Sequence, residues 1–144
     1  EPEARRSQNG VLSTSLRCAY TWRNIGQRRL YLRSYEGGLA PTLRMKPGET
    51  LKVRFIGSNN GFIHPMHIHG GPFEVVARDG ETIPASARFL ADTVNVGPGQ
   101  RYDVVWTARE PGKWLIHCHI PHHTTNNNAE EKGGGGLMVV IDVE

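Results

Sequence analysis

The chain has 144 residues, the size of one ordinary domain, and is long enough to bury a hydrophobic core of its own. Hydrophobic residues make up 38% of it and charged residues 22%, and no apolar run approaches the ~20 residues of a membrane-spanning helix. The net charge is +3, and the basic residues are scattered. These values favour a globular protein with a mildly basic surface, and they argue against membrane insertion and a nucleic-acid partner.

The sequence predicts strands, because no window shows the sustained apolar spacing of an amphipathic helix. Short β-rich runs occur at residues 10–22, 29–32, 50–56, 73–77, 102–106, 113–116 and 137–141. Turn-forming pairs separate several of them, namely Pro47-Gly48, Asp79-Gly80, Pro98-Gly99 and Pro111-Gly112. In the run 50–56 apolar and charged residues alternate, so Leu51, Val53 and Phe55 should face the core. The pattern predicts an all-β antiparallel sandwich with Greek-key connections.

We expect one domain spanning residues 1–144, since no internal repeat or change of composition divides the chain. Residues 1–9 are predicted to be a flexible N-terminal arm, and residues 126–136, with their Asn and Gly runs, an irregular loop. The first six residues contain no apolar segment of a signal peptide, so we expect a chain that has lost such a signal or never carried one.

All seven histidines fall in two short windows, residues 64–69 and 117–123. Random placement does not produce such clusters, and histidine is the commonest metal ligand in proteins. In a strand, side chains two residues apart project from the same face, so each H-x-H sequence should present two imidazoles together. The pairs predicted as metal ligands are His67 with His69 and His117 with His119.

Cys118 lies between His117 and His119, so strand alternation should point its sulfur to the opposite face. The candidate partners of the sulfur on that face are His64 and His123. Two imidazoles and a thiolate, with a weak or missing axial ligand, form the blue-copper ligand set, because these donors suit copper in both of its oxidation states. One strand would then serve two metal sites.

Other interpretations of these residues are open at this point. Cys118 could be a buried thiol or form a disulfide with Cys18. Cys18 lies in a predicted strand and is itself expected to be an ordinary buried side chain. Histidine and cysteine also bind zinc readily. A cupin-type metal site could combine His67 and His69 with Glu74, but it would leave the cysteine without a role.

Residues 64–70 read H-P-M-H-I-H-G, and residues 117–123 read H-C-H-I-P-H-H. This combination resembles the paired copper signatures of multicopper oxidases, specifically those of their last cupredoxin domain. Segments between the two motifs are also similar to that domain, whereas residues 39–50 are more similar to the opening of a first domain. The resemblance covers residues 35–143 and implies a cupredoxin-like Greek-key β-sandwich.

Carried over position by position, the resemblance implies a type 1 blue copper held by His64, Cys118 and His123. The ligands of a type 2/type 3 copper cluster, where oxygen is reduced, would be His67, His69, His117 and His119. Since two of these histidines flank the type 1 cysteine, the backbone would join the two centres by a short covalent route.

The chain departs from the family pattern at three points. The position of the usual axial methionine holds Asn128; if the loop that follows is an insertion, Leu137 aligns with the axial position and Met138 lies next to it. We favour a non-coordinating Leu137, which would raise the reduction potential of the copper. His122 has no family role and competes with His123 for the ligand position. Finally, a trinuclear cluster in this family takes eight histidines from two domains, and this chain supplies four.

These features predict a laccase-like, copper-dependent oxidoreductase of the multicopper-oxidase type. A small reducing substrate or a redox protein would deliver single electrons near His123, whose ring edge is expected close to the surface, and molecular oxygen would be the acceptor. The cluster would be completed by a homo-oligomer with histidine pairs at its interface; otherwise the chain is a domain of a larger oxidase, or its histidines hold fewer copper ions.

The alternative function is an electron-transfer or copper-binding cupredoxin in which only the type 1 copper is functional. The carboxylates of Asp92, Glu74 and Asp103 are candidates to orient imidazoles, but solvated side chains at strand edges are favoured. By the family resemblance, a periplasmic or extracellular location is expected.

Overall fold

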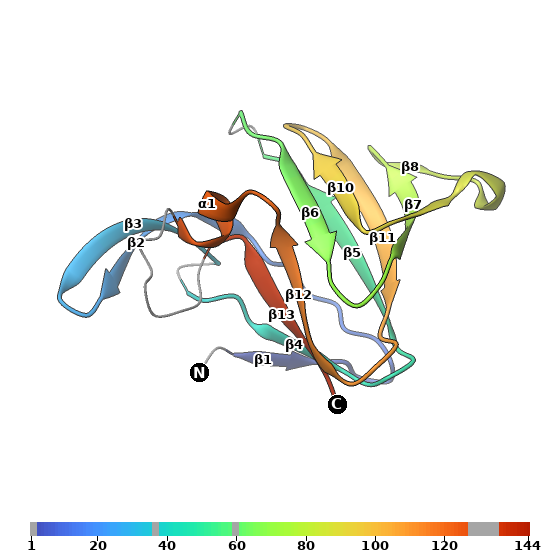
Figure 1. Ribbon diagram of the computed structural model, residues 1–144, viewed down its shortest axis with the longest axis horizontal. Coiled ribbons are helices and arrows are strands. Elements are labelled where there is room, and N and C mark those ends of the chain that lie inside the picture. The colour runs from blue at the N-terminus through green and yellow to red at the C-terminus, as the bar shows by residue number, and fades with distance from the viewer. Residues whose placement is uncertain (1–2, 36–37, 59–60, 127–135) are drawn as a thin grey trace.

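In the computed structural model, two packed β-sheets form the body of the protein and a separate two-stranded hairpin projects from it (Figure 1). The structure describes residues 3–35, 38–58, 61–126 and 136–144. The predicted all-β, cupredoxin-like fold is confirmed, and the helical elements of the described residues are short: η1 (Ala85–Ala87) and α1 (Pro121–Thr124). In this part of the chain, no helix is long and apolar enough to cross a membrane.

The first sheet has six strands in the order β1-β4-β13-β12-β6-β10. Their bounds are Ala4–Arg6 (β1), Thr42–Met45 (β4), Met138–Val143 (β13), Gly112–Cys118 (β12), His64–Ile68 (β6) and Thr93–Val96 (β10). β12 lies between β13 and β6 and is antiparallel to both. The sheet is mixed rather than wholly antiparallel, because β4 runs parallel to β1 and to β13. Parallel neighbours need a long connection, and the chain between β4 and β13 builds the whole second sheet.

The second sheet has the strand order β5-β11-β7-β8, with β9 paired to β7. The bounds are Thr50–Ile56 (β5), Arg101–Thr107 (β11), Phe73–Arg78 (β7), Glu81–Thr82 (β8) and Phe89–Ala91 (β9). The alternation predicted for β5 is confirmed, since Leu51 and Phe55 are buried and Val53 is half-buried between exposed neighbours.

One apolar core lies between the two sheets. The side chains that are fully shielded from solvent include Ile68, Phe73, Val75, Val104, Trp106 and Ile141. Complete burial of one such side chain stabilises the fold by about 1.5–3 kcal/mol. Cys118 belongs to the same buried cluster, so the strand that carries its sulfur is held rigidly by the packing of both sheets.

The two segments predicted to be irregular have different outcomes. Within the arm predicted for residues 1–9, Ala4–Arg6 form β1, and Arg6 makes an ion pair with Glu144 at 2.7 Å. A three-residue edge strand is stabilised mainly by backbone hydrogen bonds, which leave no side-chain pattern in the sequence. Most of the loop predicted at residues 126–136, namely residues 127–135, lies outside the described residues.

β2 (Cys18–Ile25) and β3 (Arg28–Tyr35) form the separate hairpin, which points away from the sandwich in Figure 1. The strands turn at Gly26, whose φ of 59° lies in the left-handed region that glycine adopts without steric cost. The strand begins at Cys18 rather than at residue 10, because residues 12–17 make no strand pairing. The base of the hairpin approaches α1, which matters for the site below.

Candidate metal centres

The end of β12 divides its side chains between two faces of the first sheet. His117 lies opposite His67 of β6, and Cys118 lies opposite Met66. Residues directly opposite each other on neighbouring strands point to the same side of a sheet, so His67 and His117 share one face and Cys118 points to the other. His119 follows directly after the strand. The backbone therefore has the division between two faces that the H-C-H sequence predicts.

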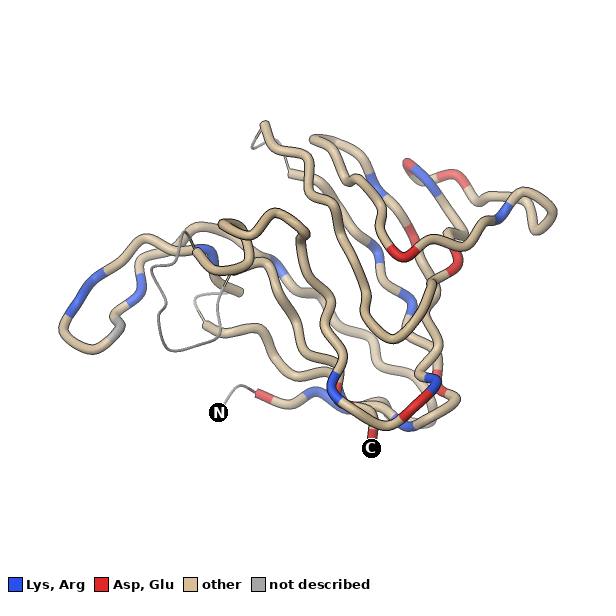
Figure 2. Tube along the Cα trace, in the orientation of Figure 1, with Lys and Arg blue, Asp and Glu red and all other residues tan. Residues whose placement is uncertain are grey.

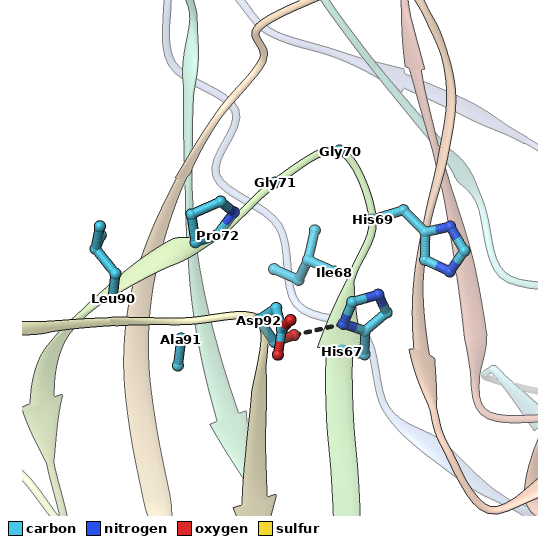
Figure 3. Close-up of a pocket in the computed structure, with 9 residues that line it drawn as sticks. All are labelled: His67, Ile68, His69, Gly70, Gly71, Pro72, Leu90, Ala91 and Asp92. Carbon is cyan, nitrogen blue, oxygen red and sulfur yellow. Dashed lines mark hydrogen bonds between the residues drawn. The ribbon is translucent and has the colours of Figure 1, made fainter.

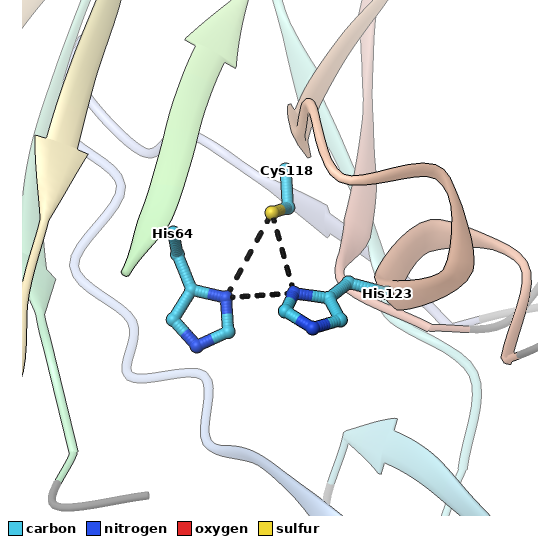
Figure 4. Close-up of side chains that lie close together, drawn as sticks. All are labelled: His64, Cys118 and His123. Atoms are coloured by element: carbon cyan, nitrogen blue, oxygen red, sulfur yellow. Dashed lines mark hydrogen bonds between the residues drawn. The ribbon is translucent and has the colours of Figure 1, made fainter. Parts of the chain in front are cut away.

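On the buried face, His64, Cys118 and His123 come together from three elements, β6, β12 and α1; we call them the closed site (Figure 4). The Cys118 Sγ is 3.7 Å from the His64 Nδ1 and 3.6 Å from the His123 Nδ1, and the two Nδ1 atoms are 3.2 Å apart. These are the three residues that the sequence predicted as partners, although 59 positions separate the two histidines.

The three donor atoms of the closed site fit a metal ion. A point equidistant from them lies about 2 Å from each atom, and metal–nitrogen and metal–sulfur bonds are about 2.0–2.3 Å long. One thiolate with two imidazoles is the donor set typical of copper that changes its oxidation state. The residues present therefore fit copper in number, chemistry and spacing.

Burial sets the electrostatics of the closed site. It raises the pKa of the Cys118 thiol, whereas the Ile120 amide, which donates to the sulfur at 3.5 Å, and the Arg33 charge lower that pKa. Burial also lowers the pKa of His123 to about 4 and lowers the pKa of His64, and in both cases the charge of Arg33 adds to the effect. Both imidazoles are therefore neutral near pH 7, the form that binds a metal.

The ring edge of His123, which was expected close to the surface, does not itself reach solvent, because His123 is 0% exposed. The Phe62 ring approaches it edge-on at 5.4 Å between centroids, and the His122 ring at 4.5 Å. The His123 Nε2 atom is buried and has no hydrogen-bond partner within the described part of the chain. Phe62 and His122 are themselves exposed to solvent.

The loop that carries His123 is held by local hydrogen bonds. Pro121 occupies the first turn of α1, where its fixed φ is favourable. The Thr124 hydroxyl donates to the carbonyl oxygens of Cys118 at 3.0 Å and Ile120 at 3.2 Å, and the Leu137 amide donates to the His123 carbonyl at 2.9 Å. These bonds fix His123 beside Cys118 without a contribution from the imidazole itself.

The register of β13 bears on the axial position. Met138 lies opposite His117, and cross-strand partners share a face, so the Met138 thioether belongs to the face away from the closed site. Leu137 precedes it, is partly buried against the core, and accepts a hydrogen bond from the Cys118 amide at 3.1 Å. This arrangement favours Leu137 over Met138 as the residue next to the closed site.

On the opposite face, four imidazoles gather; we call His67, His69, His117 and His119 the open site. The ligand atoms of His67, His117 and His119 lie within 4.8 Å of one another. The His69 Nε2 is 2.9 Å from the His117 Nε2. Burial, followed by the charges of the neighbouring histidines, lowers the pKa of His69 and of His119. Because like charges repel, His69 and His119 favour the neutral imidazole, the form that binds a metal.

Hydrogen bonds at Nδ1 orient two of these rings. His67 Nδ1 donates to the backbone carbonyl of Asp92 at 2.5 Å and lies 3.3 Å from the Thr93 hydroxyl oxygen. His117 Nδ1 donates to the backbone carbonyl of Cys118 at 3.0 Å. Donation through Nδ1 fixes the tautomer in which Nε2 is free to bind a metal. The orienting group is thus the backbone of Asp92 rather than its carboxylate.

A depression of about 600 Å³ opens beside the open site (Figure 3). Its lining consists of His67, Ile68, His69, Gly70, Gly71, Pro72, Leu90, Ala91 and Asp92. In Figure 3, His67 turns towards Asp92 and His69 turns away from it, towards β12. The imidazoles are therefore reached from solvent along one side.

The other candidate residues belong to neither group of possible metal ligands. Glu74 pairs with Arg88 at 3.5 Å, which opposes the cupin interpretation, and the Asp103 carboxylate receives two hydrogen bonds from the guanidinium of Arg54, at 2.6 and 2.8 Å. His122 is exposed, and His123 rather than His122 lies in the group with His64 and Cys118 that could hold a metal ion. Both cysteines are free, so no disulfide joins Cys18 to Cys118.

Two residues near the closed site were not predicted from the sequence, Arg33 and Asn126. Arg33 comes from β3, and its charge acts on all three side chains of the closed site. Asn126 joins the end of the ligand loop to the backbone of Arg33. No local motif marks either residue, because 93 positions separate them and their contact exists only in the folded chain.

Comparison with known proteins bears on the family and the fold of the chain. The multicopper oxidase family profile matches residues 20–130. Among solved structures, the chain is similar to the multicopper oxidase mgLAC, with a TM-score of 0.65 and 36% identity over 82% of this chain and 37% of that one. It is also similar to the blue copper oxidase of Nitrosomonas europaea, with a TM-score of 0.66 and 31% identity over 83% of this chain and 36% of that one.

Curated relatives match shorter stretches. The multicopper oxidase mco of Staphylococcus haemolyticus is 38% identical over 63 residues, 44% of this chain and 14% of the relative. Laccase-2 of Fomitopsis schrenkii is 38% identical over 78 residues, 52% of this chain and 15% of the relative. The chain thus spans about a seventh of the length of these relatives. Since the family profile covers more than half of the chain, the protein belongs to the multicopper oxidase family.

Proposed function

We propose that the protein is a laccase-like oxidoreductase in which the closed site holds a type 1 copper and the open site contributes ligands to a type 2/type 3 copper cluster. Copper is the cofactor that the family implies, and when bound it supplies one-electron chemistry at both sites, with molecular oxygen as the final acceptor. The observation that carries the proposal is the position of Cys118, which enters one site while its two neighbours in sequence enter the other.

In this proposal the closed site is a rigid cage. His64, Cys118 and His123 are held by a core strand, a neighbouring strand and a hydrogen-bonded turn, so their donor atoms need little movement when the charge of the site changes. Burial excludes water from the sulfur. A fixed, dry donor set lowers the cost of electron transfer by avoiding reorganisation.

The backbone of Cys118 connects the two sites. His117 and His119 are each one peptide bond away, and the His117 Nδ1 also donates to the Cys118 carbonyl at 3.0 Å. The route from the sulfur to the open site therefore runs through covalent bonds and one hydrogen bond rather than through space.

The open site is incomplete within one chain, because a trinuclear cluster in this family takes eight histidines. Its imidazoles lie at a solvent-accessible face, beside the depression lined by His67 and His69. A homo-oligomer in which such faces meet would double the histidine set by symmetry. The short match to the relatives also allows a second domain of a longer protein to supply the missing ligands.

We propose a small reducing substrate or a redox protein as the electron donor, and a periplasmic or extracellular location. Residues 1–144 are proposed to form one cupredoxin domain. The second candidate function is electron transfer by the closed site alone, and the observation that favours it is the incomplete ligand set of the open site.

Copper analysis combined with solution mass separates the two functions. We expect an intense visible absorption band that bleaches on reduction, about two and a half copper ions per chain in a two-fold dimer, and oxygen consumption with a phenolic or ferrous donor. About one copper per monomeric chain, with the band present and no oxygen consumption, would instead identify an electron-transfer protein. Absence of the band would reject both functions.

A further inference from the structure

Arg33 is a buried cation at the base of the β2–β3 hairpin, beside the closed site. It is 9% exposed. Of the other arginines of the hairpin, Arg28 and Arg29 are exposed and Arg23 is half-buried. Figure 2 shows no acidic residue on the two strands of the hairpin. Its Nη1 atom donates to the backbone carbonyl of His122 at 3.3 Å. On its other side, the guanidinium lies over the ring of Tyr20, 4.6 Å from the centroid. The side chain is therefore held between the hairpin and the loop that carries His123.

The backbone of Arg33 fixes both ends of the segment that leaves the closed site. The Asn126 side chain accepts from the Arg33 amide at 2.8 Å and donates to the Arg33 carbonyl at 3.0 Å. The same carbonyl accepts from the Gly136 amide at 3.3 Å. Asn126 follows α1, and Gly136 precedes Leu137, so one residue of the hairpin is hydrogen-bonded to both ends. This attachment keeps the Arg33 charge at a constant place relative to His123.

The charge of Arg33 has no counterion among the residues that the structure describes, since no ion pair involves it there. The charge lies next to the closed site, because the guanidinium donates to the carbonyl oxygen of His122, the residue before His123. A buried charge is screened by salt much less than an exposed one. The effect should therefore persist at physiological ionic strength.

We infer that Arg33 is a fixed positive charge that raises the reduction potential of copper held in the closed site. The inference rests on the proposed function. The oxidised ion carries one more positive charge than the reduced ion, so a nearby cation disfavours the oxidised state in proportion to their Coulomb interaction. The direction is the same as that of the apolar side chain of Leu137. A site tuned by both residues accepts electrons from weaker reductants than a site without them.

The test is a redox titration of the copper-loaded Arg33→Gln variant, followed by the absorption band of the Cys118–copper bond. Glutamine keeps a hydrogen-bond donor and removes the charge. At a fixed solution potential we expect the ratio of oxidised to reduced copper to rise about tenfold, which corresponds to about 59 mV for a one-electron couple. Unchanged potential in this variant, with the band intact, would overturn the inference and leave the proposed function standing.

Two matched variants separate charge from packing. Arg33→Lys keeps the charge but loses the planar guanidinium group. Its ratio of oxidised to reduced copper should stay within about twofold of the ratio in the unaltered protein. Arg29→Gln removes an exposed arginine from the same face of the hairpin, where it lies over Trp22 at 5.1 Å, and should leave the ratio unchanged. If the lysine variant shifted as far as the glutamine variant, packing rather than charge would set the potential, which contradicts the inference.

A second pair of variants, at Tyr20, tests the inference if the Arg33→Gln protein does not bind copper. Tyr20 is 39% exposed and lies against the guanidinium, so Tyr20→Glu places a carboxylate beside Arg33 without removing it. Compared with Tyr20→Gln, it should move the ratio towards oxidised copper, and equal ratios in the two variants would refute the inference. Absence of the band from the unaltered protein would refute the proposed function and this inference together.

Discussion

The closed site and the open site both take neighbouring residues from the end of β12, yet they differ in burial and in the elements that supply their other side chains. The closed site takes its donors from three elements, and two of its three side chains are fully buried. The open site takes four imidazoles from the ends of two paired strands, and one of them is exposed to solvent. One site is complete within the chain, and the other ends at a surface.

The difference shows how the pleat of a strand separates two chemical environments. Cys118 turns into the core, where the sulfur is dry, while His117 and His119 turn to the outer face. Because the side-chain period of a strand is two, a single residue changes from an enclosed donor to an accessible one. Variants that act on only one face can therefore test the two sites independently.

The largest effect is expected for Cys118→Ser. A serine hydroxyl does not replace a thiolate as a copper ligand, so the intense visible band should disappear completely. Copper at the open site should remain measurable by metal analysis, because its ligands are untouched. A variant that kept the coloured band would show that the closed site is not the source of the colour.

A second large effect is expected for His67→Ala. Loss of one imidazole from the open site should reduce oxygen consumption roughly a hundredfold or more, because even removal of an outer partner of a metal ligand typically costs 10–100-fold. The visible band should be retained, since the closed site lies on the other face. The comparison variant is His122→Ala, which removes a histidine outside the open site and should leave the copper content of the open site unchanged. Loss of the band in His67→Ala would mean that the two sites are not separable.

A smaller effect is expected for Asn126→Ala, which acts on the loop of the closed site. It removes two buried hydrogen bonds to the Arg33 backbone, so the free energy of unfolding should fall by about 2 kcal/mol or more in urea titrations. Asn126 has a φ of 49°, and Asn126→Gly controls for this backbone conformation, which glycine adopts without strain. If Asn126→Gly were as stable as the unaltered protein, the side-chain bonds would contribute nothing.

The smallest effect is expected for Thr93→Val, on the side of the open site. Its hydroxyl is 3.3 Å from the His67 Nδ1, whereas the Asp92 carbonyl is 2.5 Å away and is unaffected by the substitution. The free energy of unfolding should change by less than about 0.5 kcal/mol, the usual limit for substitutions away from a critical contact. A change in copper content measured by metal analysis would show that the carbonyl alone does not orient His67.

Much of the fold and the site follows from local sequence. The alternation in β5 predicts which side chains face the core, and the turn-forming pairs separate the strands. The seven histidines and Cys118 predict two sites because spacing within a strand fixes the face of each residue. The grouping of His64 with Cys118 and His123 followed from chemistry and resemblance, and the distances between their donor atoms agree with it.

Other features have no local signal. The parallel pairing of β4 with β13, and the strand β1 inside the predicted arm, depend on which backbones meet after folding. The complete burial of His123 was not predicted, because it depends on neighbours such as Phe62 and His122, whose rings pack edge-on against it. The solvent exposure of a side chain depends on the packing of the whole chain. A sequence motif can therefore identify a candidate metal ligand without indicating how deeply that side chain is buried.

The sequence by itself determined the donors, their types and the faces on which they lie, because these depend on residue identity and on a period of two along a strand. Tertiary structure alone decided that an arginine and an asparagine 93 positions apart would meet at the closed site. Hydrogen bonds and charges act over a few ångströms of space, whatever the separation along the chain, and the hairpin brings Arg33 within that range only after the sandwich has formed.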